Sequence, residues 1–237
     1  MTKKVYITGA DRGLGFALVK EFLKRDYIVF AGRYLKDWQW LGDLKAKYPD
    51  RLNIVDLDIS DDESIGKAKK NLVNNISSLD VLINNAGIYF DNADDIFGDL
   101  NFEIMEKMYK INSLGTLKVT HSVIDLLLNG KEKLLVNISS EAGSIENCWR
   151  KKEYGYSMSK TAVNMQSAIL QNHLKEYGIK VFAIHPGYMK SYMLGEKNMD
   201  ADIEPEESAE KIYKLIFSKK NNFNHIYYDY LGNELPW

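Results

Sequence analysis

The chain has 237 residues, 45% of them hydrophobic, and a formal charge of −2 at neutral pH. This length is enough for one sizeable core, and the balanced charge argues against a nucleic-acid-binding protein. Cys148 is the single cysteine of the sequence, which excludes an intramolecular disulfide and a cysteine metal cluster.

The N-terminus and the histidines narrow the class further. The apolar run after Lys4 ends at Gly9, so it is too short for a signal peptide or a membrane-spanning helix. The histidines are scattered without metal-ligand spacing, at His121, His173, His185 and His225. We therefore expect a cytoplasmic protein that uses no metal and binds neither nucleic acid nor membranes.

Short apolar runs alternate with helical stretches along the chain, which indicates βαβ units. The expected strands cover 5–8, 27–31, 52–57, 81–83, 134–138, 179–184 and 225–230. The expected helices cover 16–25, 36–48, a stretch that opens at 60, 101–111, 112–128, 154–177 and a stretch that opens at 205. We predict one α/β domain over residues 1–237, a doubly wound Rossmann-like fold whose mostly parallel seven-stranded sheet carries helices on both faces.

Local signals place some helix ends and helix faces. Ser60 and Glu63 have the spacing of a capping box, which predicts the start of the third helix. Asn112 disfavours helix in the middle of a helical pattern and predicts a kink. The inner face of the helix 36–48 is expected to hold Trp38, Leu41 and Leu44.

A glycine-rich turn, Gly9-Ala10-Asp11-Arg12-Gly13-Leu14-Gly15, joins the first strand to the first helix. Its spacing, Thr-Gly-x-x-x-Gly-x-Gly, differs from the common G-x-G-x-x-G fingerprint of dinucleotide sites and from a P-loop. Glycines let the backbone approach a pyrophosphate, and the helix N-terminus offers free N–H groups. The turn predicts a dinucleotide site, with a ligand-free glycine turn as the alternative.

The end of the second strand bears on the choice of cofactor. An NAD site usually carries an acidic residue there for the ribose 2′-hydroxyl, whereas this chain has Arg33, with Arg12 in the glycine turn. A guanidinium suits a 2′-phosphate, so we favour NADP(H) over NAD(H). Solvated surface arginines are the alternative.

Two further strand ends predict contacts with a nucleotide. Asp58 follows the third strand and is expected to accept a hydrogen bond from the adenine amino group. The fourth strand ends in Asn84-Asn85-Ala86-Gly87, where small residues allow close backbone approach near the ribose. A plain turn aspartate and an Asn-rich turn are the alternatives.

Tyr156 and Lys160 stand four positions apart and lie on one face of the expected helix. A fixed ammonium favours the phenolate and lowers the tyrosine pKa from its ordinary value of about 10. Such a pair can give a proton to a carbonyl oxygen or take one from an alcohol. A chance pair on a solvated helix face is the alternative.

Taken in order, these motifs resemble the compact single-domain branch of the short-chain dehydrogenase/reductase family. The match covers nearly the whole chain: Thr8-Gly9-x-x-x-Gly13-x-Gly15, Asn84-Asn85-Ala86-Gly87, Asn112, Ser140, Tyr156-x-x-x-Lys160 and Pro186-Gly187. The terminal Gly-x-x-Leu-Pro-Trp and His185-Pro186-Gly187 are similar to the sniffer-like carbonyl reductases. Lys190-Ser191 departs from that group, and the segment 141–153 looks slightly long, which is expected to affect the substrate mouth.

The resemblance implies a catalytic tetrad of Asn112, Ser140, Tyr156 and Lys160. Tyr156 would be the proton donor or acceptor, Ser140 would hold the substrate oxygen, and Asn112 would position a water linked to Lys160. Lys160 would also bind the nicotinamide ribose and lower the pKa of Tyr156. Ser139 and Tyr154 are the competing serine and tyrosine, and Tyr154 has methionine rather than lysine four positions on.

The expected cofactor contacts follow from the same resemblance. They are Gly9, Asp11, Arg12, Gly13, Leu14, Gly15, Arg33, Asp58, Ile59, Asn85, Ala86, Gly87, Tyr156, Lys160, Pro186, Gly187, Met189 and Ser191. The candidate substrate walls are Tyr89, Phe90, Trp149, Tyr188, Met189 and Met193.

The implied activity is hydride transfer between NADP(H) and a small carbonyl or alcohol substrate. A 3-oxoacyl-thioester reductase and a non-catalytic NADP(H)-sensing protein on the same fold are the alternatives. The resemblance also implies a homodimer or homotetramer, paired through the helices 112–128 and 154–177.

Overall fold

A computed structural model describes residues 2–90 and 96–237 of the chain. Its strands form one parallel sheet, with the seven strands that were predicted. Their order is β3-β2-β1-β4-β5-β6-β7. The strands are β1 (Lys4–Ile7), β2 (Ile28–Arg33), β3 (Leu52–Asp56), β4 (Val81–Asn84), β5 (Leu134–Ile138), β6 (Lys180–His185) and β7 (Tyr227–Asp229).

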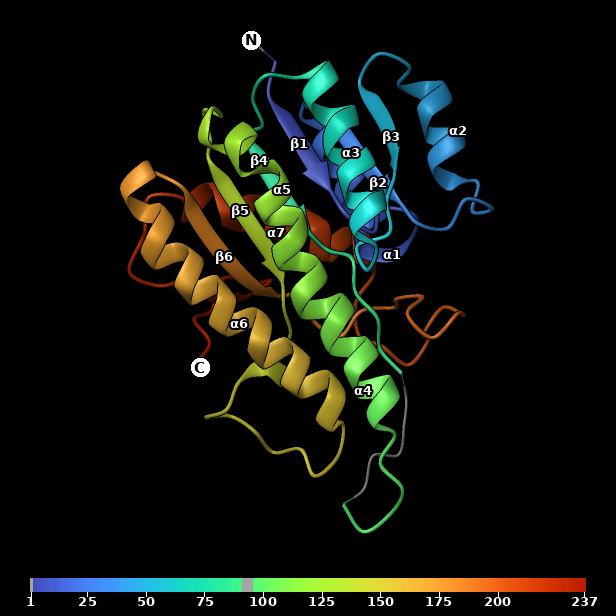
Figure 1. The fold of residues 1–237 in the computed structure, drawn as a ribbon, viewed down its shortest axis with the longest axis vertical. Coiled ribbons are helices and arrows are strands. Elements are labelled where there is room, and N and C mark those ends of the chain that lie inside the picture. Colours follow the sequence, from blue (N-terminus) through green and yellow to red (C-terminus); the bar gives the residue numbers. More distant parts are fainter. Residues whose placement is uncertain (1, 91–95) are drawn as a thin grey trace.

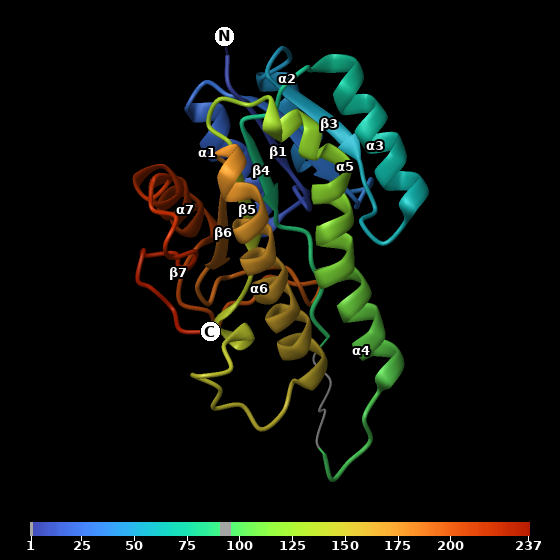
Figure 2. The same cartoon turned by 60° about the vertical axis from the view of Figure 1, so that its left-hand side comes forward.

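Helices cover both faces of this sheet (Figures 1 and 2). The α-helices are α1 (Gly13–Lys24), α2 (Trp40–Lys47), α3 (Asp62–Asn75), α4 (Phe102–Met108), α5 (Thr116–Leu128), α6 (Tyr154–Leu174) and α7 (Pro205–Ser218). Shorter helical pieces are the π-helix η1 (Tyr109–Gly115) and the 3₁₀ turns η2 (Glu141–Gly143) and η3 (Lys175–Tyr177). None of the helices in the described ranges is long and apolar enough to span a bilayer.

The two faces of the sheet bury separate apolar cores. Alternate residues of a strand point to opposite faces, so Val5 and Ile7 of β1 join α1 and α7 in one core. Tyr6, between them, joins α3 and α5 in the other core. Figure 1 shows α3, α5 and α6 in front of the sheet and α1 and α7 behind it. This is the doubly wound arrangement that the alternating pattern predicts.

The structure corrects two of the predicted helix starts. The side chain of Asp61 caps α3, accepting from the N–H groups of Glu63 (3.1 Å) and Ser64 (3.3 Å), while the hydroxyl of Ser60 donates to Asp58 (2.7 Å). The capping box at Ser60 was therefore wrong, because the adjacent aspartate is an equally good cap.

The second correction concerns Trp38. Helix α2 begins at Trp40, so Trp38 lies in the preceding turn and packs edge-on against Trp40 and Tyr192. Leu41 alone among the three expected inner residues is fully buried.

The long helical stretch before β5 is interrupted where Asn112 predicted a kink. Helices α4 and α5 are joined by the π-helical turn η1, which contains Asn112. A π-helical turn inserts an extra residue into the hydrogen-bond ladder and often marks a functional site. Here it turns the buried side chain of Asn112 toward the loop after β4.

A stripe of buried polar side chains joins α6 to the sheet. Lys160, Asn164, Ser167 and Gln171 recur at helical spacing and are all buried. Their hydrogen bonds are Lys160 Nζ to Ile138 O (2.9 Å), Asn164 Nδ2 to Gly143 O (3.1 Å), Asn137 Nδ2 to Ser167 Oγ (2.9 Å) and Val181 N to Gln171 Oε1 (2.8 Å). Because buried polar groups need partners, a slip of α6 along the sheet would leave them all unpaired.

Removing one of these partners tests the stripe. In Ser167→Ala, Asn137 Nδ2 loses its acceptor inside the core, so the free energy of unfolding should fall by about 1–3 kcal/mol in urea denaturation. Ser218→Ala is the control, because the Ser218 hydroxyl bonds only its own helix and the expected change is within about 0.5 kcal/mol. Equal stability of the two variants would contradict the role of the stripe.

Candidate active site

The carboxyl ends of the parallel strands meet at one edge of the sheet, where a cavity of about 440 Å³ opens. It is lined by most residues that the sequence predicted for the cofactor: Gly9, Asp11, Arg12, Gly13, Leu14, Gly15, Asp58, Ile59, Asn85, Ala86, Gly87, Tyr156, Lys160, Pro186, Met189 and Ser191. The lining set does not include Arg33 or Gly187, nor the tetrad members Asn112 and Ser140.

The glycine turn has the shape needed for a dinucleotide phosphate. Gly9 has a φ of +62°, and a Cβ there would lie 2.7 Å from Ala86 Cα. A Cβ at Gly15 would lie 2.1 Å from the carbonyl oxygen of Gly9. At Gly13, in contrast, a Cβ would meet nothing within 4 Å. Two glycines thus pack the turn tightly against its surroundings, and the third leaves open space at the N-terminus of α1.

Side chains that directly follow β1 and β4 hold this turn in place. Asn85 Nδ2 donates to the carbonyl oxygens of Thr8 (3.0 Å) and Gly9 (2.9 Å). Thr8 Oγ1 accepts from the N–H groups of Asn85 and Ala86, both at 3.0 Å. The Asn-Asn-Ala-Gly motif therefore supports the glycine turn in addition to lining the cavity.

The two arginines expected at the 2′-phosphate are in different surroundings. Arg33 pairs with Asp56, with Nη2 and Oδ1 2.7 Å apart, and lies outside the cavity lining. Arg12 lines the cavity, and its guanidinium stacks over the Trp38 ring at 5.2 Å from the centroid. Arg12 is thus the better placed of the two for an anion in the cavity.

The predicted acidic residues are engaged with the backbone. The buried carboxylate of Asp11 accepts from the N–H groups of Tyr34 (3.1 Å) and Leu35 (3.0 Å), which fixes the loop after β2. Burial raises the pKa of Asp11, while these N–H donors oppose the rise. Asp58 accepts from the N–H (2.8 Å) and hydroxyl (2.7 Å) of Ser60, so its carboxylate is held at the cavity rim.

Helix α6 presents Tyr156 and Lys160 to the cavity together. Lys160 Nζ lies 5.7 Å from the centre of the Tyr156 ring and donates to Ile138 O at the end of β5 (2.9 Å). The side chain of Ser140, which follows β5, is close enough to the Tyr156 phenol to lower its pKa as a hydrogen-bonding neighbour. The structure thus brings together the three predicted groups: phenol, hydroxyl and ammonium.

The electrostatics of this trio differ from the simple expectation. Burial raises the pKa of Tyr156 to about 12, although the hydrogen bond from Ser140 acts in the opposite direction. Burial also lowers the pKa of Lys160 to about 8. The predicted lowering of the phenol pKa does not appear, because loss of hydration outweighs the lowering effects of Ser140 and Arg150.

Asn112 holds backbone in place. Its amide clamps Ile88, accepting from the Ile88 N–H (2.8 Å) and donating to the Ile88 carbonyl oxygen (2.9 Å). The same Nδ2 donates to Ser159 Oγ on α6 (3.0 Å). Asn112 therefore joins η1, the loop after β4 and α6, and its expected role in positioning a water stays a prediction.

A charged network closes the segment 141–153 over Tyr156. Arg150 pairs with Glu141 (2.5 Å) and Glu153 (2.7 Å), and Glu153 accepts from the Tyr89 hydroxyl (2.9 Å). The Tyr89 ring packs edge-on against Tyr156, with 5.0 Å between centroids. This network ties the substrate-side loop to the ring that carries the phenol.

The other expected substrate walls divide into two groups. Phe90, Met189 and Met193 line the cavity. Trp149 is 74% exposed and packs under Arg150, and Tyr188 is also exposed. The loop after β6 is braced by ion pairs from Lys190 (3.1 Å) and Lys197 (2.8 Å) to Glu204.

Several lining residues were missed by the sequence analysis. They are Tyr34, Leu35, Leu57, Ser60, Ile88, Lys107, Ile111, Ile138 and Tyr192. Ser139, the competing serine, also lines the cavity, and its hydroxyl donates to Asn164 Oδ1 (2.6 Å). Most of the missed residues are neighbours of a predicted motif at the carboxyl end of a strand. Extending each motif by one or two residues would have found them. Lys107 and Tyr192 come from a helix and a loop whose approach to the cavity no local pattern reveals.

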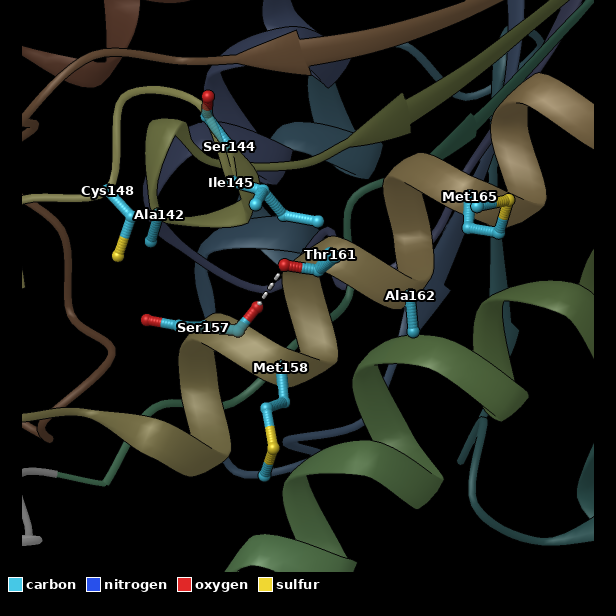
Figure 3. A pocket seen from close by; sticks show the side chains of 9 residues that line it. All are labelled: Ala142, Ser144, Ile145, Cys148, Ser157, Met158, Thr161, Ala162 and Met165. Atoms are coloured by element: carbon cyan, nitrogen blue, oxygen red, sulfur yellow. Dashed lines mark hydrogen bonds between the residues drawn. The ribbon is translucent and has the colours of Figure 1, made fainter. Parts of the chain in front are cut away.

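A second cavity, of about 470 Å³, lies on the far side of the turn after Ser140 (Figure 3). The residues that line it are Ala142, Ser144, Ile145, Cys148, Ser157, Met158, Thr161, Ala162 and Met165. This lining carries no charged side chain, so we assign the chemistry to the first cavity.

Comparisons with known proteins agree with this geometry. The sequence profile described as short chain dehydrogenase matches residues 3–202. The chain belongs to the short-chain dehydrogenase/reductase family. An uncharacterized oxidoreductase of Schizosaccharomyces pombe is 29% identical over 259 residues, covering 100% of this chain and 99% of that protein.

Two solved structures show the same short-chain dehydrogenase/reductase fold. The NADPH-bound carbonyl reductase from chicken fatty liver is 28% identical, with a TM-score of 0.87, over 100% of this chain and 99% of that one. The carbonyl reductase Sniffer of D. melanogaster is 25% identical, with a TM-score of 0.89, over 100% of both chains.

The buried lysine of this short-chain dehydrogenase/reductase predicts a pH dependence of stability. Below about pH 8 Lys160 is protonated in the folded and unfolded states alike, whereas between about 8 and its ordinary 10.5 the unfolded state holds more protons. The free energy of unfolding of the wild type should therefore rise with pH in this window relative to Lys160→Met. Urea denaturation at pH 7 to 10 measures the free energy of unfolding of both proteins. Their difference removes the contribution of other titrating groups, such as Lys180, because these are the same in both. Parallel curves would contradict the buried, depressed lysine.

Proposed function

We propose that this short-chain dehydrogenase/reductase is an NADP(H)-dependent carbonyl reductase with Tyr156 as its general acid and base. The observation that carries the proposal is that Tyr156 and Lys160 line one cavity with the glycine turn, and that the Ser140 side chain lies next to the Tyr156 phenol. The neighbouring solved structures named as carbonyl reductases support the reaction class.

The cavity residues fit a dinucleotide. The open space at Gly13 and the free N-terminus of α1 suit a pyrophosphate, since a backbone without Cβ lets the phosphate approach. When bound, the nicotinamide supplies the hydride or accepts it. Lys160 is placed to hold the adjoining ribose, and Ala86 and Gly87 leave room along the cavity wall.

The proton would travel through Tyr156. In reduction, the phenol O–H donates its proton to the carbonyl oxygen as that oxygen gains negative charge, while Ser140 donates a second hydrogen bond to the same oxygen. A phenol pKa of about 12 keeps the donor protonated at neutral pH, which favours the reducing direction. The ammonium of Lys160 stabilises the phenolate that remains, because its Nζ lies 5.7 Å from the centre of the Tyr156 ring.

The lining of the cavity indicates the class of substrate. Phe90, Met189 and Met193 of the lining are apolar or aromatic. Tyr156 is the lining residue that would meet the substrate oxygen, with Ser140 beside it outside the lining set. A pocket of this kind suits an apolar aldehyde or ketone whose oxygen is its main polar group.

The predicted homodimer or homotetramer is also part of this proposal. It is supported by exposed apolar residues of α6, which are Met158, Met165 and Ile169.

Replacing the proposed acid tests the mechanism. Tyr156→Phe should lower kcat by about 10³-fold or more with a panel of aldehydes, ketones and quinones, because the proton donor is lost. Binding of NADPH, followed by fluorescence, should persist. Tyr154→Phe is the matched control on the same helix and should keep its activity. A Tyr156→Phe enzyme with retained turnover, or a wild type that binds NADPH without oxidising it, would refute the proposal.

The two arginines allow a separate test of the cofactor. Arg12→Gln should raise KM for NADPH by about ten-fold or more and leave KM for NADH nearly unchanged, because a charge-assisted hydrogen bond to phosphate contributes about 1.5–3 kcal/mol. Arg33→Gln, whose arginine is engaged with Asp56, should have the smaller effect. Wild-type use of NADH equal to NADPH would overturn the assignment.

A further inference from the structure

The catalytic-site serine is held from an unexpected part of the chain. The hydroxyl of Tyr227, on β7, donates to the backbone carbonyl oxygen of Ser140 at 2.6 Å, across a separation of 87 residues. The Tyr227 side chain is fully buried, so water does not compete for this bond. Ser140 Oγ in turn accepts from the N–H of Ala142 (3.1 Å), which fixes its side chain on the turn η2.

The same C-terminal stretch also holds residues 144–146, which follow this turn. Trp237 stacks on the Tyr227 ring, with centroids 5.2 Å apart and planes at 15°. The carbonyl oxygen of Trp237 accepts from the N–H groups of Ile145 (2.6 Å) and Glu146 (2.8 Å). Ser144 Oγ donates to the carbonyl oxygens of Pro236 (2.8 Å) and Trp237 (3.1 Å).

Helix α6 supports the turn at one place. Gly143 packs so closely on α6 that a Cβ there would lie 2.8 Å from Lys160 O, and its carbonyl oxygen accepts from Thr161 (3.2 Å) and Asn164 (3.1 Å). Beyond Gly143 the segment borders the cavity in Figure 3, where Ile145 and Met158 stand on opposite walls. On the side of the cavity, open space separates the residues after Gly143 from α6. Hydrogen bonds to residues 227–237 hold them there instead.

We propose that Tyr227, braced by Trp237, is a positioning residue that fixes the Ser140 hydroxyl relative to the Tyr156 phenol. The proposal rests on the proposed function. Without the Tyr227 hydroxyl, the buried Ser140 carbonyl loses its partner, and the turn must move to find another. The Ser140 side chain then moves relative to the Tyr156 phenol, its pKa-lowering effect on the phenol weakens, and the pKa rises.

The test replaces Tyr227 by phenylalanine. Tyr227→Phe should lower kcat by roughly ten-fold, the equivalent of about one hydrogen bond, with the Kd for NADPH unchanged. In alcohol oxidation, which needs the phenolate, the rising limb of kcat against pH should shift to higher pH. A loss of stability alone would not move that limb.

Tyr228→Phe is the matched control. Tyr228 is the next residue of β7, is equally buried, and donates to the carbonyl oxygen of His225 (3.3 Å) away from the site. It should leave kcat and the pH profile as in the wild type. If the two variants have the same kcat and the same pH profile, Tyr227 has no positioning role.

Two further measurements keep the result decisive. If Tyr227→Phe fails to fold, Trp237→Ala replaces it as the test, because it removes the stacked ring from a partly exposed position. It should shift the rising limb of kcat to higher pH in the same way. An unchanged pH profile would contradict the inference. Crystal structures of the Phe variants separate this inference from the proposed function, since they need no turnover. The distance from Ser140 Oγ to the Tyr156 hydroxyl should lengthen in Tyr227→Phe and not in Tyr228→Phe, and an unchanged distance would overturn the inference.

Discussion

The placement of the proposed chemistry depends on the buried hydrogen bonds between α6 and the sheet. Lys160 bonds the backbone at the end of β5 and Asn164 bonds the backbone of the turn η2 beyond it. Ser167 and Gln171 continue the contact along β5 and β6. These bonds lie in the dry interior, so each unmade bond would cost more than the net gain from an ordinary one. The helix therefore has one register on the sheet, and that register places Tyr156 at the cavity.

The same interior explains the electrostatic character of the site. Lys160 belongs both to the polar stripe and to the proposed catalytic group, and its burial lowers its pKa to about 8. Burial acts on the neighbouring phenol in the opposite direction and leaves it a proton donor at neutral pH. A site built in this way suits reduction of a carbonyl group, where the resting enzyme must hold the proton that it will donate.

Much of this arrangement could be predicted because it depends on residues close together in sequence. The glycine turn, the Asn85-Ala86-Gly87 strand end and the Tyr156–Lys160 spacing are local patterns, and all line one cavity. The predictions that the structure corrects depended on contacts between distant residues, or on a choice between two effects that the sequence does not decide. Asp61 replaced Ser60 as a helix cap, and burial reversed the expected shift at Tyr156. Arg33 pairs with Asp56, and its contact with a 2′-phosphate stays a prediction. The bond from Tyr227 to Ser140 joins residues that no sequence spacing relates.

The most direct test of the central claim is a crystal structure of the wild-type protein with NADP⁺ and an unreactive ketone analogue. The account predicts that the ketone oxygen lies within about 3.2 Å of both the Tyr156 and Ser140 hydroxyls, with the reacting carbon about 3–3.5 Å from the nicotinamide ring. A dinucleotide bound away from the glycine turn, or a ketone oxygen that meets neither hydroxyl, would contradict it.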